Sequence, residues 1–239
     1  MATIITNEEE ALAAVRQDGM ALQDVLEYYK TVELCREAVK SNGTALQYVP
    51  ENLKTEELCL EAVKEDGMAL GYAPFKLKTA ELCIEAVRQN GSALQFVPVD
   101  LKTAELCLEA VKEDGEALLY VPENHKTAEL CLEAVKNNGS SLQFVPWEQL
   151  KLTVPAMAEF YLEAVKSNGM ALQDVPLNLK TAELCLEAVK QNGMALYVVP
   201  DELKTPELCL EAVKCIGFAL EYVPQHMRGE VRAAIKNGA

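Results

Sequence analysis

The cysteines are the residues whose type and spacing first suggest chemistry. Seven of the eight recur within LCLEAV or a close variant, and Tyr161 takes the cysteine's place once. A zinc site needs Cys or His pairs two to four residues apart, whereas these cysteines are solitary and 24 residues apart. One repeat of separation also exceeds the reach of a disulfide. We therefore interpret them as core residues. The eighth, Cys215, lies outside the pattern, and we expect an inert thiol there.

Acid–base groups are the second kind of candidate. His125 and His226, the two histidines, lie two repeats or more apart, and we expect His125 to be half-buried. Paired acids such as Glu105 and Glu109 recur in nearly every unit, which is typical of a solvated helix face. The EDG sequences offer too few oxygens for calcium. We expect no catalytic residue, no cofactor and no metal site, so the protein is predicted not to be an enzyme.

Charge and hydropathy narrow the function classes. With 22 Lys and Arg against 37 Asp and Glu, the formal net charge is −15. Nucleic-acid binding needs clustered positive charge, so we expect no nucleic-acid partner. An acidic surface suits solubility or a basic partner. The apolar runs are too short for a membrane span, and MATIITNEEE lacks the features of a secretory signal. Together with reduced cysteines, this predicts a cytoplasmic protein without a membrane partner.

One repeat of 24 residues positions all of these groups. The cysteine slot recurs every 24 residues, except for 30 between Cys131 and Tyr161. A glycine follows each slot eight residues later, and a proline closes each full unit. Gly19 marks a degenerate first copy whose slot holds Ala11, which makes nine copies. Self-similarity at this period is the signature of a solenoid.

The unit from Thr103 to Lys126 illustrates the expected local structure. Thr103 is a good N-cap for an α-helix. Helical winding places an apolar arc on one face, and this arc is expected to be buried between neighbours. It comprises Leu106, Cys107, Leu108, Ala110 and Val111. Gly115 is expected to end the helix in the left-handed conformation. The segment EALLYVP then forms a short helical turn, of α or 3₁₀ type, because Pro122 stops it.

The fold class that follows is all-α: an α-solenoid of about nine 24-residue repeats, each with one α-helix and one short α or 3₁₀ helix. We expect a right-handed superhelix, although the sequence itself does not give handedness or curvature. A leucine-rich repeat has a similar period, but the L-x-L strand and its asparagine are missing. We expect a single solenoid domain over 1–239. Its parts are a degenerate cap (1–30), five repeats (31–146), an insertion (147–156), three repeats (157–228) and a capping helix (229–239).

The repeat resembles a known family. Units such as LKTEELCLEAVKEDGMALGYAP, Leu53 to Pro74, and LKTAELCLEAVKQNGMALYVVP, Leu179 to Pro200, are similar to the bacterial repeats called domain of unknown function 4116. The resemblance covers about Asn7 to Arg228 and departs in the first copy and at 147–156. It implies a helical repeat fold. It implies no activity, cofactor or site residue.

Binding residues are expected where the copies differ. One variable position on the flank of the short helix is mostly aromatic, and the position after the proline is apolar in several copies. The candidates for partner contact are Tyr48, Tyr72, Phe75, Phe96, Tyr120, Phe144, Trp147 and Tyr222. The aromatic side chains either seal the groove between neighbouring repeats or form a strip that contacts a partner. The insertion either bends the solenoid and repacks locally or exposes a docking patch.

The function predicted from these features is a non-catalytic scaffold or adaptor that binds a protein or peptide. Repeat architecture without a catalytic constellation motivates it. The alternative is a self-associating structural rod, or the targeting arm of a larger bacterial effector.

Overall fold

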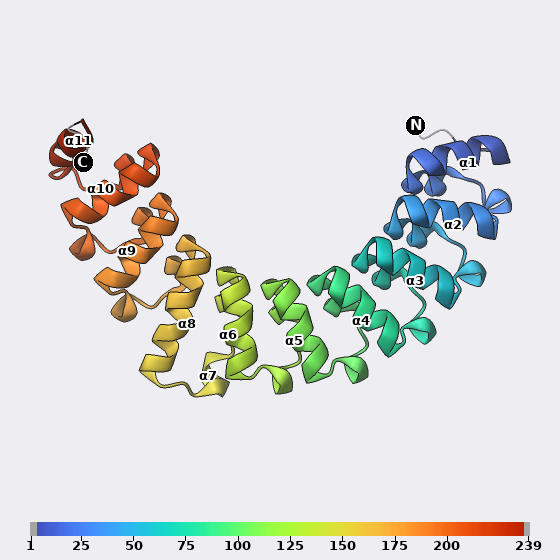
Figure 1. The fold of residues 1–239 in the computed structure, drawn as a ribbon, viewed down its shortest axis with the longest axis horizontal. Coiled ribbons are helices and arrows are strands. Elements are labelled where there is room, and N and C mark those ends of the chain that lie inside the picture. Colours follow the sequence, from blue (N-terminus) through green and yellow to red (C-terminus); the bar gives the residue numbers. More distant parts are fainter. Residues whose placement is uncertain (1–3, 237–239) are drawn as a thin grey trace. The chain divides into compact units, whose positions relative to one another are not determined.

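The computed structural model describes residues 4–236, and every element in that range is helical apart from one isolated bridge between Ile5 and Val25. The chain divides into two compact units, Met1–His125 and Lys126–Ala239. Each consists of stacked repeats of one α-helix and a six-residue 3₁₀ helix, most of them joined by a three-residue 3₁₀ turn at the corner (Figure 1). The all-α repeat fold predicted from the sequence is thus confirmed, and the corner turn is an addition to it.

Unit 1 contains five repeats of uniform length. Its α-helices are α1 (Glu8–Gln17), α2 (Val32–Ser41), α3 (Glu56–Glu65), α4 (Ala80–Gln89) and α5 (Ala104–Glu113). The six-residue 3₁₀ helices are η1 (Gly19–Asp24), η3 (Gly43–Tyr48), η5 (Gly67–Tyr72), η7 (Gly91–Phe96) and η9 (Gly115–Tyr120). The corner turns are η2 (Glu27–Tyr29), η4 (Glu51–Leu53), η6 (Phe75–Leu77), η8 (Val99–Leu101) and η10 (Glu123–His125).

Unit 2 contains the insertion and the carboxy-terminal helix. Its α-helices are α6 (Ala128–Asn137), α7 (Trp147–Leu150), α8 (Val154–Ser167), α9 (Ala182–Gln191), α10 (Pro206–Cys215) and α11 (Arg228–Lys236). Its 3₁₀ helices are η11 (Gly139–Phe144), η12 (Gly169–Asp174), η13 (Leu177–Leu179), η14 (Gly193–Val198), η15 (Asp201–Leu203) and η16 (Gly217–Tyr222). The predicted capping helix corresponds to α11. The ends of the predicted caps, 1–3 and 237–239, lie outside the described residues.

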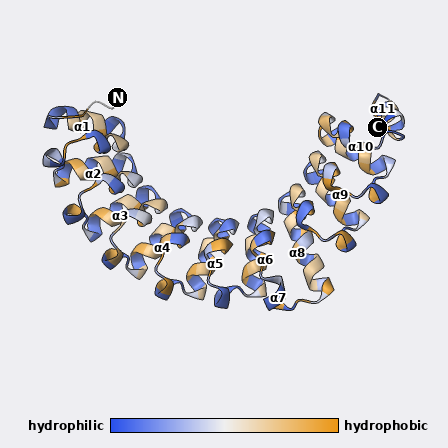
Figure 2. Ribbon diagram, turned by 180° about the vertical axis from the view of Figure 1, so that it is seen from behind, coloured by the Kyte–Doolittle hydropathy of each residue, from blue (hydrophilic) through white to orange (hydrophobic). Residues whose placement is uncertain are grey.

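The core is built from the same positions in each repeat. In α5, Leu106 is 7% exposed, and Cys107, Ala110 and Val111 are fully buried. The leucine of each six-residue 3₁₀ helix, such as Leu118, is also fully buried in most repeats. Within each unit, a six-residue 3₁₀ helix that is followed by another repeat packs against the α-helices of its own and the next repeat, so stacking supplies the cover that a single repeat lacks. Figure 2 shows the resulting alternation of apolar and polar residues along the helices.

The predicted buried arc is too wide by one residue. The side chain of Leu108 is 36% exposed. Leu60 and Ile84, in the equivalent positions of α3 and α4, are each 37% exposed. This residue directly follows the cysteine, and at 100° per residue it falls at the edge of the buried face. The α-helices of a repeat stack therefore leave a row of half-covered aliphatic side chains.

The prediction that glycine ends the α-helix in a left-handed conformation is wrong. Among the described residues, the one non-glycine residue with positive φ is Lys151, and the repeat glycines do not adopt it either. The α-helix ends instead at an extended residue such as Asp66, whose carboxylate accepts a hydrogen bond from the Met68 amide at 2.8 Å. Asp66 is thus the N-cap of the 3₁₀ helix that follows.

Close packing explains the glycine. A Cβ at Gly67 would lie closer than 3.0 Å to the carbonyl oxygen of Ala86, which belongs to the next α-helix. The same clash with the next helix recurs at Gly19, Gly43 and Gly91 in unit 1 and at Gly139, Gly169 and Gly193 in unit 2. The glycine therefore sets how closely consecutive repeats approach.

Candidate functional site

The aromatic row predicted as a contact strip is mostly half-buried. Tyr48, Phe96 and Tyr120 in unit 1 are half-buried, and Tyr72 is 39% exposed. The Phe96 ring covers Gly71 of the preceding repeat, where a Cβ would lie 3.0 Å from two ring carbons. At this position the aromatic side chain closes the groove between neighbouring repeats.

The same row in unit 2 is also half-buried. Phe144 and Tyr222 are both partly covered, and the Tyr222 ring meets Tyr197 edge-on at 5.2 Å between centroids. Tyr197 itself is 65% exposed. The aromatic row is therefore mainly a packing element, and Tyr72 is its most exposed aromatic member.

Five lysines, which we call the lysine row, bond to the backbone carbonyl oxygens at the position of the aromatic row, and sequence reasoning did not single them out. Lys30 Nζ donates to the Tyr48 carbonyl oxygen at 3.1 Å, and Lys102 Nζ donates to that of Tyr120 at 2.9 Å. Lys54, Lys78 and Lys180 make the same bond to Tyr72, Phe96 and Val198, each 18 residues ahead. The sequence does contain a signal for these lysines, because a lysine directly precedes the capping threonine in each of these repeats.

These lysines are structural, as their burial indicates. The side chains of Lys30 and Lys54 are only 6% and 8% exposed. Burial lowers the pKa of Lys78 and of Lys102. Each ammonium group satisfies a carbonyl oxygen at the end of a 3₁₀ helix, which would otherwise lack a donor. Because part of the positive charge is held inside the repeats, the outer surface is more acidic than the composition suggests.

The recurrent cysteines lie in the core beside these lysines. Burial raises the pKa of Cys35, Cys59, Cys83 and Cys107 to about 11, despite the opposing charge of the nearby lysine. A thiol with that pKa is protonated at neutral pH and is a poor nucleophile. Within residues 4–236, no group of three or more His, Cys, Asp or Glu residues is placed to hold a metal ion.

The insertion packs onto its own unit. Trp147, the first residue of α7, is half-buried and lies 5.5 Å from the Phe160 ring and 5.3 Å from the Tyr161 ring. Both belong to α8, which begins at Val154, inside the predicted insertion, and runs for 14 residues rather than ten. The left-handed Lys151 makes the turn between α7 and α8. Trp147 thus acts as a packing residue between these two helices.

The corner turns carry apolar residues that are more exposed than the aromatic row, among them the predicted candidate Phe75. Phe75 is 76% exposed and Val99 is 77% exposed at the first position of η6 and η8, two consecutive corners of unit 1. The flanking corners carry Glu51 and Glu123 at that position, both exposed. Leu177, at the equivalent position in unit 2, is 72% exposed. We call Phe75 and Val99 the corner pair.

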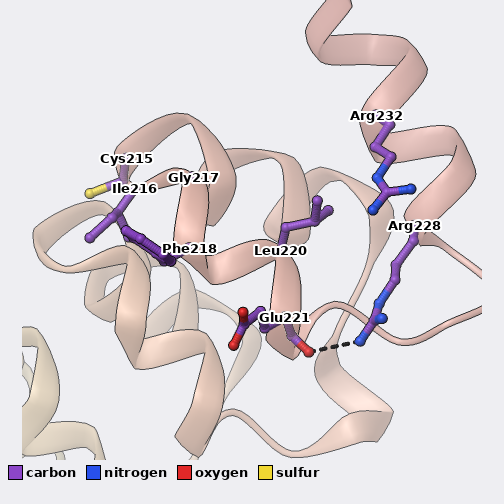
Figure 3. A pocket seen from close by; sticks show the side chains of 8 residues that line it. All are labelled: Cys215, Ile216, Gly217, Phe218, Leu220, Glu221, Arg228 and Arg232. Atoms are coloured by element: carbon purple, nitrogen blue, oxygen red, sulfur yellow. Dashed lines mark hydrogen bonds between the residues drawn. The ribbon is translucent and has the colours of Figure 1, made fainter.

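The carboxy-terminal end of unit 2 carries an open groove. Its volume is about 770 Å³, and Figure 3 shows its lining. Its apolar lining includes Ile216, Phe218 and Leu220, and Phe218 is 74% exposed. Arg228 and Arg232 of α11 line the other side. Arg228 donates to the carbonyl oxygens of Glu221 at 2.8 Å and Val223 at 2.9 Å, whereas no hydrogen bond or ion pair joins Arg232 to the rest of residues 4–236.

The fold and these surfaces define an all-α repeat protein. Comparison with known families identifies its family: the chain belongs to the family described as domain of unknown function (DUF4116). Four tandem segments match it, residues 7–54, 55–102, 104–151 and 159–204, each of which spans two of the 24-residue repeats. Searches of curated proteins and of solved structures returned no match. No helix in the described part of the chain is long and apolar enough to span a membrane.

Proposed function

We propose that the protein is a non-catalytic scaffold that binds a protein or peptide through the corner pair of unit 1. The observation that carries the proposal is the exposure of Phe75 and Val99, 76% and 77%, at equivalent positions of consecutive repeats. Large apolar side chains this exposed in adjacent repeats favour an interaction surface, because covering them releases apolar area from water.

The surroundings of the corner pair indicate the chemistry of the partner. Glu51, Asp100 and Glu123 are exposed on the same or flanking corners, and Lys76 is the one exposed cation there. An apolar contact rimmed by carboxylates suits a segment with apolar and basic residues. Charges of opposite sign raise the association rate and select the partner more than they add affinity.

The aromatic row contributes to this function indirectly. Tyr48, Phe96 and Tyr120 support the stack beneath the corners, and Tyr72 presents a partly exposed ring in the same repeat as Phe75. We also propose that the protein works in a reducing compartment such as the cytoplasm, because its buried thiols need no disulfide partner.

Affinity capture at micromolar protein concentration, followed by mass spectrometry, tests the scaffold proposal. The double variant Phe75→Ser, Val99→Ser is compared with wild type and with Glu51→Ser, Glu123→Ser, which changes the same position of the flanking corners. We expect the apolar double variant to weaken partner binding at least tenfold while the acidic double variant has a smaller effect. If no partner is retained at micromolar concentration, or if both variants retain it equally well, the proposal fails.

A further inference from the structure

The junction between consecutive repeats has two complementary halves. In unit 2 the first half is the start of a six-residue 3₁₀ helix, where Gly193 lies under the next α-helix. The second half is the last turn of that helix, whose Ala212 carbonyl oxygen approaches Gly193 too closely to admit a Cβ. The pairs Gly19 with Ala38, Gly43 with Ala62 and Gly169 with Ala188 repeat this arrangement.

The carboxy-terminal end of unit 2 presents the first half uncovered. Gly217 begins η16, yet a Cβ there would meet nothing within 4 Å. Its neighbour Phe218 is 74% exposed, and Leu220 is half-buried where the equivalent Leu196 is fully buried. Helix α11 packs on α10, with Val231 buried near Pro206 and Leu210. It reaches the end of η16 through the bond from Arg228 to the Glu221 carbonyl oxygen and leaves the start of η16, at Gly217 and Phe218, open (Figure 3).

The first helix of unit 1 presents the second half uncovered. Ala14 of α1 holds the place of Ala38, which is fully buried against Gly19 of the preceding repeat. Ala14 is half-buried, and among the described residues no preceding helix covers it. Glu10 occupies the place of the buried Leu34 and is exposed.

The two surfaces also carry opposite charges. The first turn of α1 contains Glu8, Glu9 and Glu10, all exposed. Helix α11 carries three cations, Arg228, Arg232 and Lys236, against one acid, Glu230. Arg228 and Arg232 line the open groove together with one carboxylate, Glu221, so its lining has a net positive charge. In a chain of net charge −15, a net-positive helix beside exposed apolar residues favours an acidic occupant.

We propose that the groove between η16 and α11 binds helix α1 of a second copy of this chain. The last turn of that helix lies on Gly217 as Ala212 lies on Gly193, and its acidic first turn faces Arg232. Helix α11 already covers the first part of α10. The contact between the two copies therefore uses only the part of a repeat junction that surrounds Gly217. Each copy carries one of each surface, so association is heterologous and extends beyond the dimer at high concentration. The inference uses different residues from the corner pair and stands independently of it.

Sedimentation velocity over 5–500 µM, at low and at high salt, tests the contact. We expect the average mass of the wild type to rise with protein concentration and to fall with added salt. Gly217→Ala is the decisive variant, because its Cβ has open space in one chain but would clash in the junction. We expect it to weaken association at least tenfold. Gly229→Ala, which also has open space around it, is the matched control and should associate like wild type.

A charge exchange gives a second measurement that does not depend on glycine. Glu10→Arg alone and Arg232→Glu alone should each weaken association, because like charges then meet in the contact. An equimolar mixture of the two variants should recover it, since every contact between different variants pairs opposite charges. A wild-type chain that stays monomeric at 500 µM, a Gly217→Ala variant that associates like wild type, or a mixture that does not recover would overturn the proposal.

Discussion

Gly193 and Gly217 occupy the same position in consecutive repeats of unit 2 and have opposite surroundings. Gly193 lies under the carbonyl oxygen of Ala212, whereas a Cβ added to Gly217 would have no heavy atom of another residue within 4 Å beyond its chain neighbours. Both begin a six-residue 3₁₀ helix, and neither has positive φ. The difference teaches that the repeat glycine is required by the neighbouring repeat and not by its own backbone.

The leucines of the same two 3₁₀ helices should show the largest effect. Leu196 is fully buried, so Leu196→Ala should lower the free energy of unfolding by about 3 kcal/mol through lost burial and a cavity. Leu220 is only half-buried, and Leu220→Ala should cost about 1 kcal/mol. Urea unfolding followed by circular dichroism measures both. Equal losses would mean that η16 is covered as fully as η14.

Substitution of the two glycines by alanine should change the free energy of unfolding in opposite directions. Gly193→Ala places a Cβ against the Ala212 carbonyl oxygen and Ile216, and overpacking of this kind should cost about 2 kcal/mol. Gly217→Ala should instead stabilise the monomer by about 0.5 kcal/mol, because alanine restricts the unfolded chain. Thermal unfolding at low protein concentration separates the two. A Gly217→Ala variant as unstable as Gly193→Ala would show that backbone conformation, and not the neighbour, requires glycine.

Substitution of a lysine of the lysine row should change the free energy of unfolding less than the leucine and glycine substitutions do. Lys180, which is half-buried, donates through Nζ to the Val198 carbonyl oxygen at 3.1 Å. Lys180→Met keeps the aliphatic length but removes the donor, so we expect a loss of about 1 kcal/mol. Lys190 is exposed on α9, and Lys190→Met is the control with an expected change near zero. If both variants unfold at the same urea concentration, the bond from Lys180 contributes nothing to stability.

Most of the fold could be predicted from the sequence because the same residue pattern recurs in nine copies of the repeat. Thr103 was expected to cap a helix, and its hydroxyl accepts from the Leu106 amide at 3.2 Å. The short second helix was expected to be α or 3₁₀ in type, and Gly115–Tyr120 is 3₁₀. Leu108 was misplaced because a helical wheel gives an angle but not the neighbours that cover it.

The residues of the candidate site were harder to predict from the sequence than the fold. Phe75 and Trp147 occupy the same position after a proline, yet Phe75 is 76% exposed and Trp147 packs on Phe160 and Tyr161. Nothing in the residue types separates them, because the packing of Trp147 depends on the extended α8 that follows it. The lysine row was missed for a related reason: a lysine before a helix cap is normally solvated, and its acceptor lies 18 residues away.

The sequence by itself determined the repeat, its period, its helical class and the positions that form the core, because these follow from local propensity and apolar periodicity. The tertiary structure decided what each repeated residue is for. The glycine sets the distance between repeats, the lysine satisfies a distant carbonyl, and the aromatic row seals grooves, since each role depends on atoms contributed by the next repeat. The same dependence explains why a Cβ at Gly217 would meet no neighbouring atom and why Ala14 is only half-buried, although both occupy positions that the next or the preceding repeat covers elsewhere.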